Sequence, residues 1–140
     1  MNRCLGIDFG TRRIGLALSD STGNLATPLP FLENTSLKEV IAKFQELVES
    51  HGVKTIVIGL PRNMDGSYGP SAQKVREFIT EIQPHIPAEI ISQDERLTTA
   101  QATRGLSQMG LNQKDLRKKV DSSSAALILQ QFLDRTRPTP

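Results

Sequence analysis

The stretch RCLGIDFGTRRIGLALS, residues 3–19, contains two short apolar runs separated by a polar turn. The runs cover residues 3–9 and 14–19, and each has the length and composition of a strand. A Gly-Asn pair predicts a turn into a third run over residues 25–32, whose two prolines favour an edge or an irregular end of a sheet. We therefore expect an antiparallel meander of three strands.

Beyond this meander, helical and extended patterns alternate. The tetrapeptide SLKE, residues 36–39, is a capping box that opens a helix, and Gly52 ends it. The run TIVIGL, residues 55–60, is continuous and rich in β-branched residues, which is typical of a strand covered on both faces. The remaining expected elements are a helix ended by Pro84, a strand over residues 89–93, a helix from 98 or 99 to 109, and a last helix over 120–133.

This order predicts an α/β fold. The expected sheet is mixed and five-stranded, with the three-strand antiparallel meander joined to parallel strands and helices on its faces. The 140 residues suffice for one ordinary domain with its own core. We expect a single domain over residues 1–136 and a flexible tail over 137–140.

Composition narrows the functional classes. The formal charge is +2, and 37% apolar and 23% charged residues are normal for a folded globular protein. Aromatic residues make up 4% and tryptophan is absent, so a nucleic-acid site cannot rest mainly on stacking. The lone cysteine, Cys4, falls in an apolar run and is expected to be a buried thiol. With no signal-peptide pattern and no membrane-spanning run, we expect a reducing, cytoplasmic location and no membrane partner.

Carboxylates are found where strands end or helices begin. Metal-dependent cleavage of phosphodiesters needs several such groups to converge, because Mg²⁺ prefers oxygen ligands. Asp8 lies near the end of an apolar strand, where a carboxylate is costly unless it is paired or metal-bound. The alternative is that Asp8 caps the turn that follows, and the segment alone does not separate the two interpretations.

The other candidate acids also have structural explanations. Asp94 and Glu95 follow at the end of the fifth expected strand, just before a helix. Acidic residues at a helix start interact favourably with the helix dipole, and Arg96 could pair with one of them. This structural explanation fits Asp94 better than Glu95. Asp121 is expected to open the last helix, where it would serve equally as an N-cap. Asp20 is better explained as a turn residue, as is Asp65.

The segment DFGT at residues 8–11, followed by Gly15, also resembles the first phosphate loop of the sugar-kinase and actin-like ATPases. Those enzymes close two domains around the nucleotide, and this chain has the length of one. No Gly-x-x-x-x-Gly-Lys-Ser/Thr loop or Gly-x-Gly-x-x-Gly fingerprint is present either. A phosphate-loop ATPase is therefore the weaker alternative.

Four motifs in order resemble the YqgF/RuvX family of Holliday-junction-resolvase-like proteins. They are GIDFGTRRIGLA at residues 6–17, GLPRNMDGS at 59–67, DERLTT at 94–99 and KVDSSSAA at 119–126. The resemblance spans nearly the whole chain. It implies a ribonuclease H-like fold and a nuclease that processes the 5′ end of the 16S ribosomal RNA precursor, with Holliday-junction resolution as the older proposal for the family.

By matching motifs, the resemblance assigns catalysis and binding of Mg²⁺ or Mn²⁺ to Asp8, Glu95 and Asp121. Proteins of the related RuvC type carry a further acid one helical turn after the last aspartate, and Ser124 stands there in this chain. The ions would activate water and stabilise the leaving oxygen. His51 and His85 are expected at the far surface, so neither is a candidate general base.

Basic and polar side chains border these motifs and would bind phosphates around the acids. The candidate nucleic-acid ligands are Arg12, Arg13, Arg62, Asn63, Arg96, Lys118 and Lys119. For the segment Lys114–Lys119, a solvated linker is an equally good explanation. The expected partner is precursor rRNA, with branched DNA as the alternative and ribosomal particles as a further partner. A non-catalytic RNA- or ribosome-binding protein remains open, and the chain is expected to act as a monomer or homodimer.

Overall fold

The structure is a computed structural model that describes residues 3–61, 65, 67–95 and 113–136, with the backbone alone for 95, 113–123 and 136. Five strands form one sheet: β1 (Arg3–Asp8), β2 (Arg13–Ser19), β3 (Ala26–Glu33), β4 (Val53–Pro61) and β5 (Glu89–Glu95). Their order in the sheet is β3-β2-β1-β4-β5. The expected helix ending at residue 109 and the expected tail over 137–140 lie outside the described residues.

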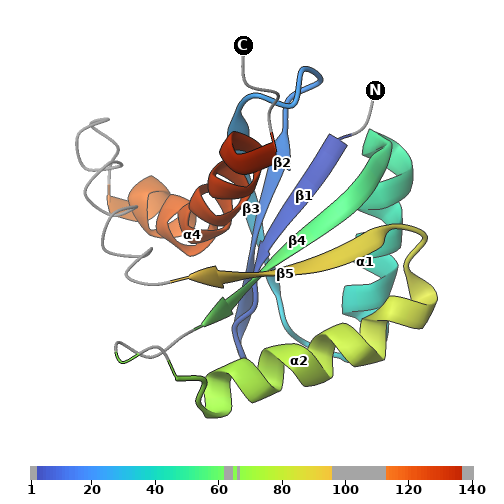
Figure 1. Ribbon diagram of the computed structural model, residues 1–140, viewed down its shortest axis with the longest axis vertical. Coiled ribbons are helices and arrows are strands. Elements are labelled where there is room, and N and C mark those ends of the chain that lie inside the picture. The colour runs from blue at the N-terminus through green and yellow to red at the C-terminus, as the bar shows by residue number, and fades with distance from the viewer. Residues whose placement is uncertain (1–2, 62–64, 66, 96–112, 137–140) are drawn as a thin grey trace.

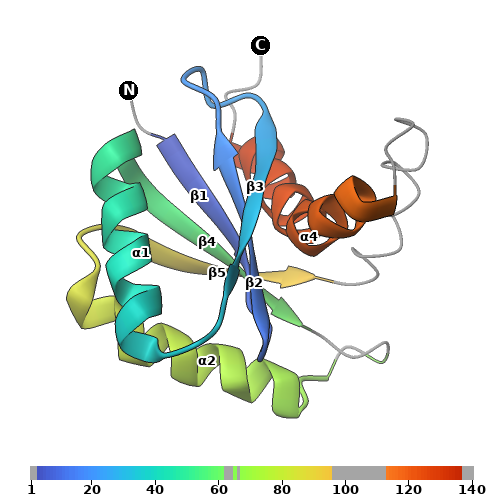
Figure 2. The same ribbon diagram turned by 180° about the vertical axis from the view of Figure 1, so that it is seen from behind.

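The sheet is mixed, as expected. β1 pairs antiparallel with β2, which pairs antiparallel with β3, while β1, β4 and β5 run parallel. The prolines of β3 lie on an edge strand, where a missing N–H donor is tolerated. Figure 2 shows β3 along the outside of the sheet, with α1 and α4 on opposite sides of it.

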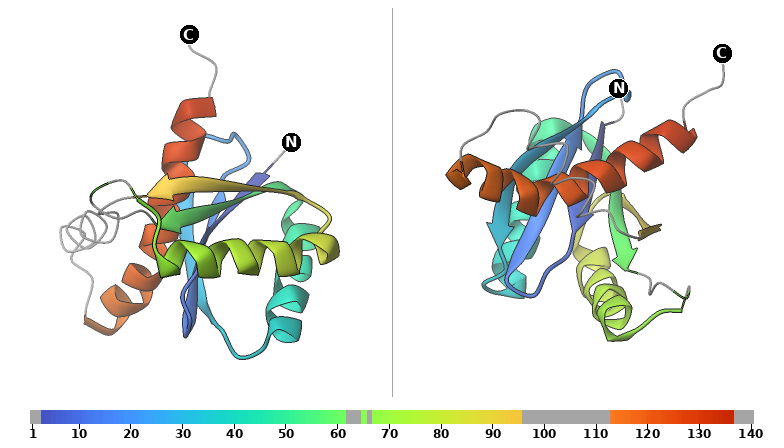
Figure 3. Two further views of the ribbon diagram at one scale, coloured as in Figure 1. Left: turned by 60° about the horizontal axis from the view of Figure 1, so that its bottom comes forward. Right: turned by 90° about the vertical axis from the view of Figure 1, so that its left-hand side faces the viewer.

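Helices cover both faces of this sheet. α1 (Leu37–His51) and α2 (Pro70–Ile82) lie on one face, and α4 (Gln113–Thr136) crosses the other (Figures 1 and 3). A short 3₁₀ turn, η1 (Gln83–His85), follows α2. Among the described residues, no helix is both long and apolar enough to cross a membrane.

The ends of α1 follow from local sequence. The Ser36 side chain accepts a hydrogen bond from the Glu39 N–H, with 3.2 Å between nitrogen and oxygen, which satisfies a donor of the first turn. The capping box is only half formed, because the Glu39 carboxylate accepts from the Thr35 hydroxyl. At the other end, Gly52 adopts φ +64°, the left-handed conformation that glycine reaches without a Cβ clash.

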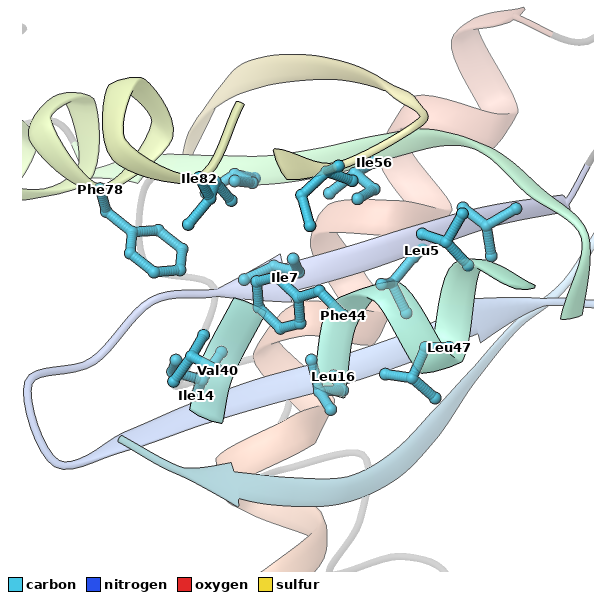
Figure 4. Close-up of a cluster of buried hydrophobic side chains, with 14 of the residues drawn as sticks. Leu5, Ile7, Ile14, Leu16, Val40, Phe44, Leu47, Ile56, Phe78 and Ile82 are labelled. Atoms are coloured by element: carbon cyan, nitrogen blue, oxygen red, sulfur yellow. The ribbon is translucent and has the colours of Figure 1, made fainter. Parts of the chain in front are cut away.

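The larger core lies between the sheet and the pair α1 and α2. Leu5 and Ile7 of β1 pack there against Phe44 of α1 and Phe78 of α2, as Figure 4 shows. A smaller cluster on the other face contains Val57 and the buried side of α4. Successive residues of β1 point alternately to these two clusters, so each residue of the strand belongs to one face of the sheet.

The start of α4 corrects the sequence-based prediction. The helix was expected over residues 120–133, but it begins at Gln113. The basic segment Lys114–Lys119 is therefore helical and not a linker, and Asp121 lies inside the helix and is not its N-cap. Apolar periodicity marks only the turns of a helix that face a core, and these first turns carry few apolar residues.

Candidate active site

The last residues of three strands lie at one edge of the sheet. Because β1, β4 and β5 are parallel, their carboxyl ends share that edge, which Figure 1 shows through the common direction of β4 and β5. Asp8 ends β1, and Glu95 ends β5 opposite Pro61 of β4. Two of the three acids assigned by resemblance are thus at the same edge, separated by a single strand.

The pleat of the strands separates Glu95 from Asp94. Leu5 and Ile7 face α1 and α2, so Asp8, one residue on, alternates to the face covered by α4. On β5, the Gln93 amide donates to the Ile128 carbonyl of α4 at 2.7 Å, so positions 93 and 95 belong to that face as well. Asp94 alternates to the opposite face, which leaves Glu95 as the one that shares a face with Asp8.

Glycine surrounds Asp8 on its own face of the sheet. Gly15 is its partner on β2, and Gly6 precedes it by two residues on β1. On β4, Gly59 follows Ile58, the partner of Ile7. The helix α4 fills the space over Gly6, but Gly15 and Gly59 place no side chain next to the carboxylate. Its oxygens are the kind of ligand that hard divalent cations prefer. The residues therefore fit a metal site.

Asp121 lies on the helix that crosses this face. A Cβ built on Gly6 would lie 2.8 Å from the Ala125 carbonyl oxygen and 2.7 Å from the Leu129 Cβ, so α4 rests directly on β1 at this glycine. Asp121 precedes Ala125 by one turn on the same side of the helix. Among the described side chains, no group of three histidine, cysteine or acidic residues forms a metal site, and that set includes only Asp8 of the three acids.

Comparison with known families identifies the chain. A family model described as RuvX, Holliday junction resolvase, matches residues 2–135. The chain belongs to this family. Its curated relatives include proteins named "Putative pre-16S rRNA nuclease" from Halalkalibacterium halodurans (43% identical, covering 95% of this chain and 96% of the relative) and Acetivibrio thermocellus (44% identical, covering 94% and 95%). The RuvX chain is accordingly a nuclease.

Solved structures confirm the ribonuclease H-like fold of this RuvX chain. The fowlpox virus resolvase in complex with Holliday junction DNA superposes with a TM-score of 0.59 at 11% identity, covering 97% of this chain and 99% of that one. The Thermus thermophilus RuvC in complex with a Holliday junction substrate gives a TM-score of 0.57 at 13% identity, covering 96% of each chain. At such low identity the likeness concerns the fold alone. The family match also favours a nuclease over a phosphate-loop ATPase.

Two of the expected phosphate ligands of the RuvX chain lie at the turn between β1 and β2, which follows Asp8. Arg12 is exposed in the turn between β1 and β2. Arg13 begins β2, two residues before Gly15, and its guanidinium carbon lies 5.0 Å from the centre of the Phe31 ring. The helix α4 includes Lys118 and Lys119, for which the structure describes the backbone alone. The expected ligands outside the described residues are Arg62, Asn63 and Arg96.

Four other residues discussed from the sequence lie away from the edge that contains Asp8 and Glu95. His51 ends α1 and His85 lies in η1, both at the opposite edge of the sheet, as expected. Asp20 accepts from the Thr22 hydroxyl at 2.8 Å, which confirms its role in a turn. Cys4 is half-buried and its sulfur forms no disulfide, and burial raises the pKa of its thiol, so thiolate chemistry is disfavoured.

Gln93 and Tyr68 are two residues that sequence reasoning did not select. Gln93 is 5% exposed and also accepts a hydrogen bond from the Arg135 guanidinium at 2.6 Å, so it ties β5 to α4. A pocket of about 550 Å³ opens beside it between these two elements. Tyr68 contacts Asp94. A polar residue near a strand end gives no signal of burial, but the chain's single tyrosine, directly after the motif at residues 59–67, could have been noticed.

Proposed function

We propose that this nuclease hydrolyses phosphodiester bonds of the 16S ribosomal RNA precursor, at its 5′ end, with Mg²⁺ or Mn²⁺ held by Asp8, Glu95 and Asp121. The observation that carries the proposal is the shared edge and face of Asp8 and Glu95, beneath the helix that contains Asp121. The substrate is inferred from the names of the relatives.

The chemistry follows from the donor set. Carboxylate oxygens are the ligands that hard divalent cations prefer. When bound, such ions supply an activated water and stabilise charge on the leaving oxygen. Asp8 would hold them at the centre, with Glu95 on β5 and Asp121 on α4 completing the site. Arg12 and Arg13 would bind phosphates of the strand and orient it.

The decisive experiment measures cleavage of precursor rRNA with Mg²⁺ or Mn²⁺. Asp8→Asn, Glu95→Gln and Asp121→Asn are each expected to lower the rate on the order of 10²-fold or more, since even partners of metal ligands cost 10- to 100-fold. Calorimetry with Mn²⁺ should show weakened binding in the same variants, and circular dichroism checks that they fold. Full activity in Asp8→Asn would refute the assignment.

Matched controls are available on the same elements. Glu89→Gln makes the same change at the exposed amino end of β5, and Asp134→Asn does so on the exposed side of α4. Both are expected to keep wild-type rates. A four-way DNA junction as substrate tests the alternative of resolvase activity, and binding of RNA without cleavage would indicate a non-catalytic protein.

We further propose that residues 1–136 act as one nuclease domain, as a monomer or homodimer, in the cytoplasm. A reducing compartment suits the single free cysteine. Sedimentation of the purified chain measures its oligomeric state, and sedimentation with ribosomal particles measures their association.

A further inference from the structure

Tyr68 lies at the edge of the sheet where the carboxyl ends of the parallel strands and the proposed metal ligands are found. It is the one tyrosine of a chain that has no tryptophan, and it lies between β4 and α2. Its hydroxyl donates a hydrogen bond to Asp94 Oδ1 at 2.8 Å, and Asp94 directly precedes Glu95. The ring is thus anchored within one residue of a proposed metal ligand.

A second contact fixes the orientation of the ring. The guanidinium carbon of Arg76, on α2, lies 4.9 Å from the centre of the Tyr68 ring, within the range of a cation–π interaction. Tyr68 nevertheless remains 40% exposed, and it is the only aromatic one among the exposed large hydrophobic side chains of the described residues. The core clusters do not include it. Core packing therefore does not explain the two anchors.

We propose that Tyr68 stacks against an unpaired base of the RNA next to the cleaved bond, while Arg76 binds a neighbouring phosphate. The inference rests on the proposed nuclease site and specifies its substrate class as a single-stranded segment. In a duplex both faces of a base are already stacked, whereas an unpaired base can lie on an aromatic ring. Because Asp94 and Glu95 belong to opposite faces of the sheet, the strand would pass over the carboxyl edge from one face to the other.

The competing explanation is structural. The bond from Tyr68 to Asp94 could serve only to hold the segment between β4 and α2 in place. In that case the hydroxyl group would matter and the aromatic ring would not. The two explanations predict opposite behaviour for a variant that keeps the ring and removes the hydroxyl.

The wild-type protein itself offers a direct measurement. Incorporation of 3-fluorotyrosine gives a single ¹⁹F resonance, because the chain has one tyrosine. A short single-stranded RNA, added without divalent metal so that it stays intact, is expected to shift this resonance. A blunt RNA duplex of the same sequence is expected to leave it in place. An unchanged resonance, while fluorescence anisotropy shows the single strand bound, would overturn the proposal.

Variants then separate the ring from its hydroxyl. Tyr68→Phe should bind single-stranded RNA as wild type does, and Tyr68→Leu should bind it about 5- to 150-fold more weakly, the range for loss of one stacked base. Equal losses in both variants would overturn the stacking role. Leu25→Ala, an exposed apolar side chain near the opposite edge, is the control.

The role of Arg76 is tested through salt. Arg76→Gln is expected to reduce the slope of log affinity against log salt by about one, as for loss of one phosphate contact. Lys54→Gln, the same change of charge at the amino end of β4, should leave the slope unchanged. An unaltered slope in Arg76→Gln would remove the phosphate contact from the proposal. Cleavage of precursor rRNA is measured separately. If RNA does not shift the ¹⁹F resonance but cleavage proceeds, only the stacking is refuted. If RNA shifts the resonance but no cleavage occurs, only the proposed function is refuted.

Discussion

Gly6→Ala tests whether the contact between α4 and β1 sets the geometry of the site. The added Cβ would lie 2.7 Å from the Leu129 Cβ and 2.8 Å from the Ala125 carbonyl oxygen. Neither atom can rotate away, because one is attached directly to the helix backbone and the other is part of it. Restoring an ordinary contact of at least 3.4 Å requires α4 to move from β1 by about 0.7 Å.

The cost in stability can be worked out from this shift. Overpacking of this kind costs about 1–3 kcal/mol, and replacing glycine by alanine recovers about 0.4–1 kcal/mol through the unfolded chain. We expect a net loss of about 1–2 kcal/mol in the free energy of unfolding, measured by urea denaturation. For a chain of this length, that loss lowers Tm by about 3–8 °C.

The effect on activity should be larger. Asp8 and Asp121 lie on the two elements that separate, and a misplacement of about 1 Å at a catalytic site can cost about 10²-fold. We expect single-turnover cleavage to slow by about 10- to 100-fold. The control is Gly52→Ala, which forces alanine into φ +64° at the end of α1 and costs about 1–2 kcal/mol far from this contact. Wild-type activity in Gly6→Ala, or an equal loss in both variants, would refute the reasoning.

Three further predictions concern single side chains. Gln93→Leu removes the bond to the Ile128 carbonyl and should lower the free energy of unfolding by about 1–2 kcal/mol; an unchanged urea midpoint would contradict this. Cys4, whose pKa is raised by burial, should react with a thiol reagent at pH 8 more slowly in the native protein than in urea, and equal rates would contradict its burial. The pKa of Asp20 is lowered, first by the Thr22 hydroxyl, so its stabilisation is present above the unfolded pKa and is lost as pH falls through the folded one. The difference in stability between wild type and Asp20→Asn should therefore shrink in acid, and a constant difference across pH would argue against this linkage.

Local chemistry made much of the fold predictable from the sequence. The helix α1 begins after Ser36 and ends before Gly52, and both ends were predictable because caps act within one turn. The prolines of residues 25–32 indicated an edge strand because proline lacks an N–H donor. The hydrogen-bond partners of the capping residues were less predictable than the ends of the helix. Glu39 bonds Thr35 and does not close the box with Ser36, a choice between two neighbouring donors that spacing alone does not decide.

The site was harder to predict because it depends on pairing between distant segments. Asp94 and Glu95 are adjacent in sequence, and only the register of β5 against β4 and its contact with α4 assign them to different faces. The glycines beside Asp8 on β2 and β4 come from two separate motifs, and the sequence does not show that they meet. The polar first turns of α4 carried no apolar stripe to mark them, so Asp121 was mistaken for a helix start.

Ser124 bears on how many carboxylates α4 contributes. It is 3% exposed, so an acid in its place would be almost excluded from water and would need a cation or several donors to offset the loss of hydration. A serine carries no such requirement, and Asp121 is then the single ligand that we propose on α4. The remaining proposed ligands are on β1 and β5, so a bound ion would join the sheet to the helix. The contact at Gly6 and the bond from Gln93 set the separation of these elements, and the affinity for metal should therefore depend on both.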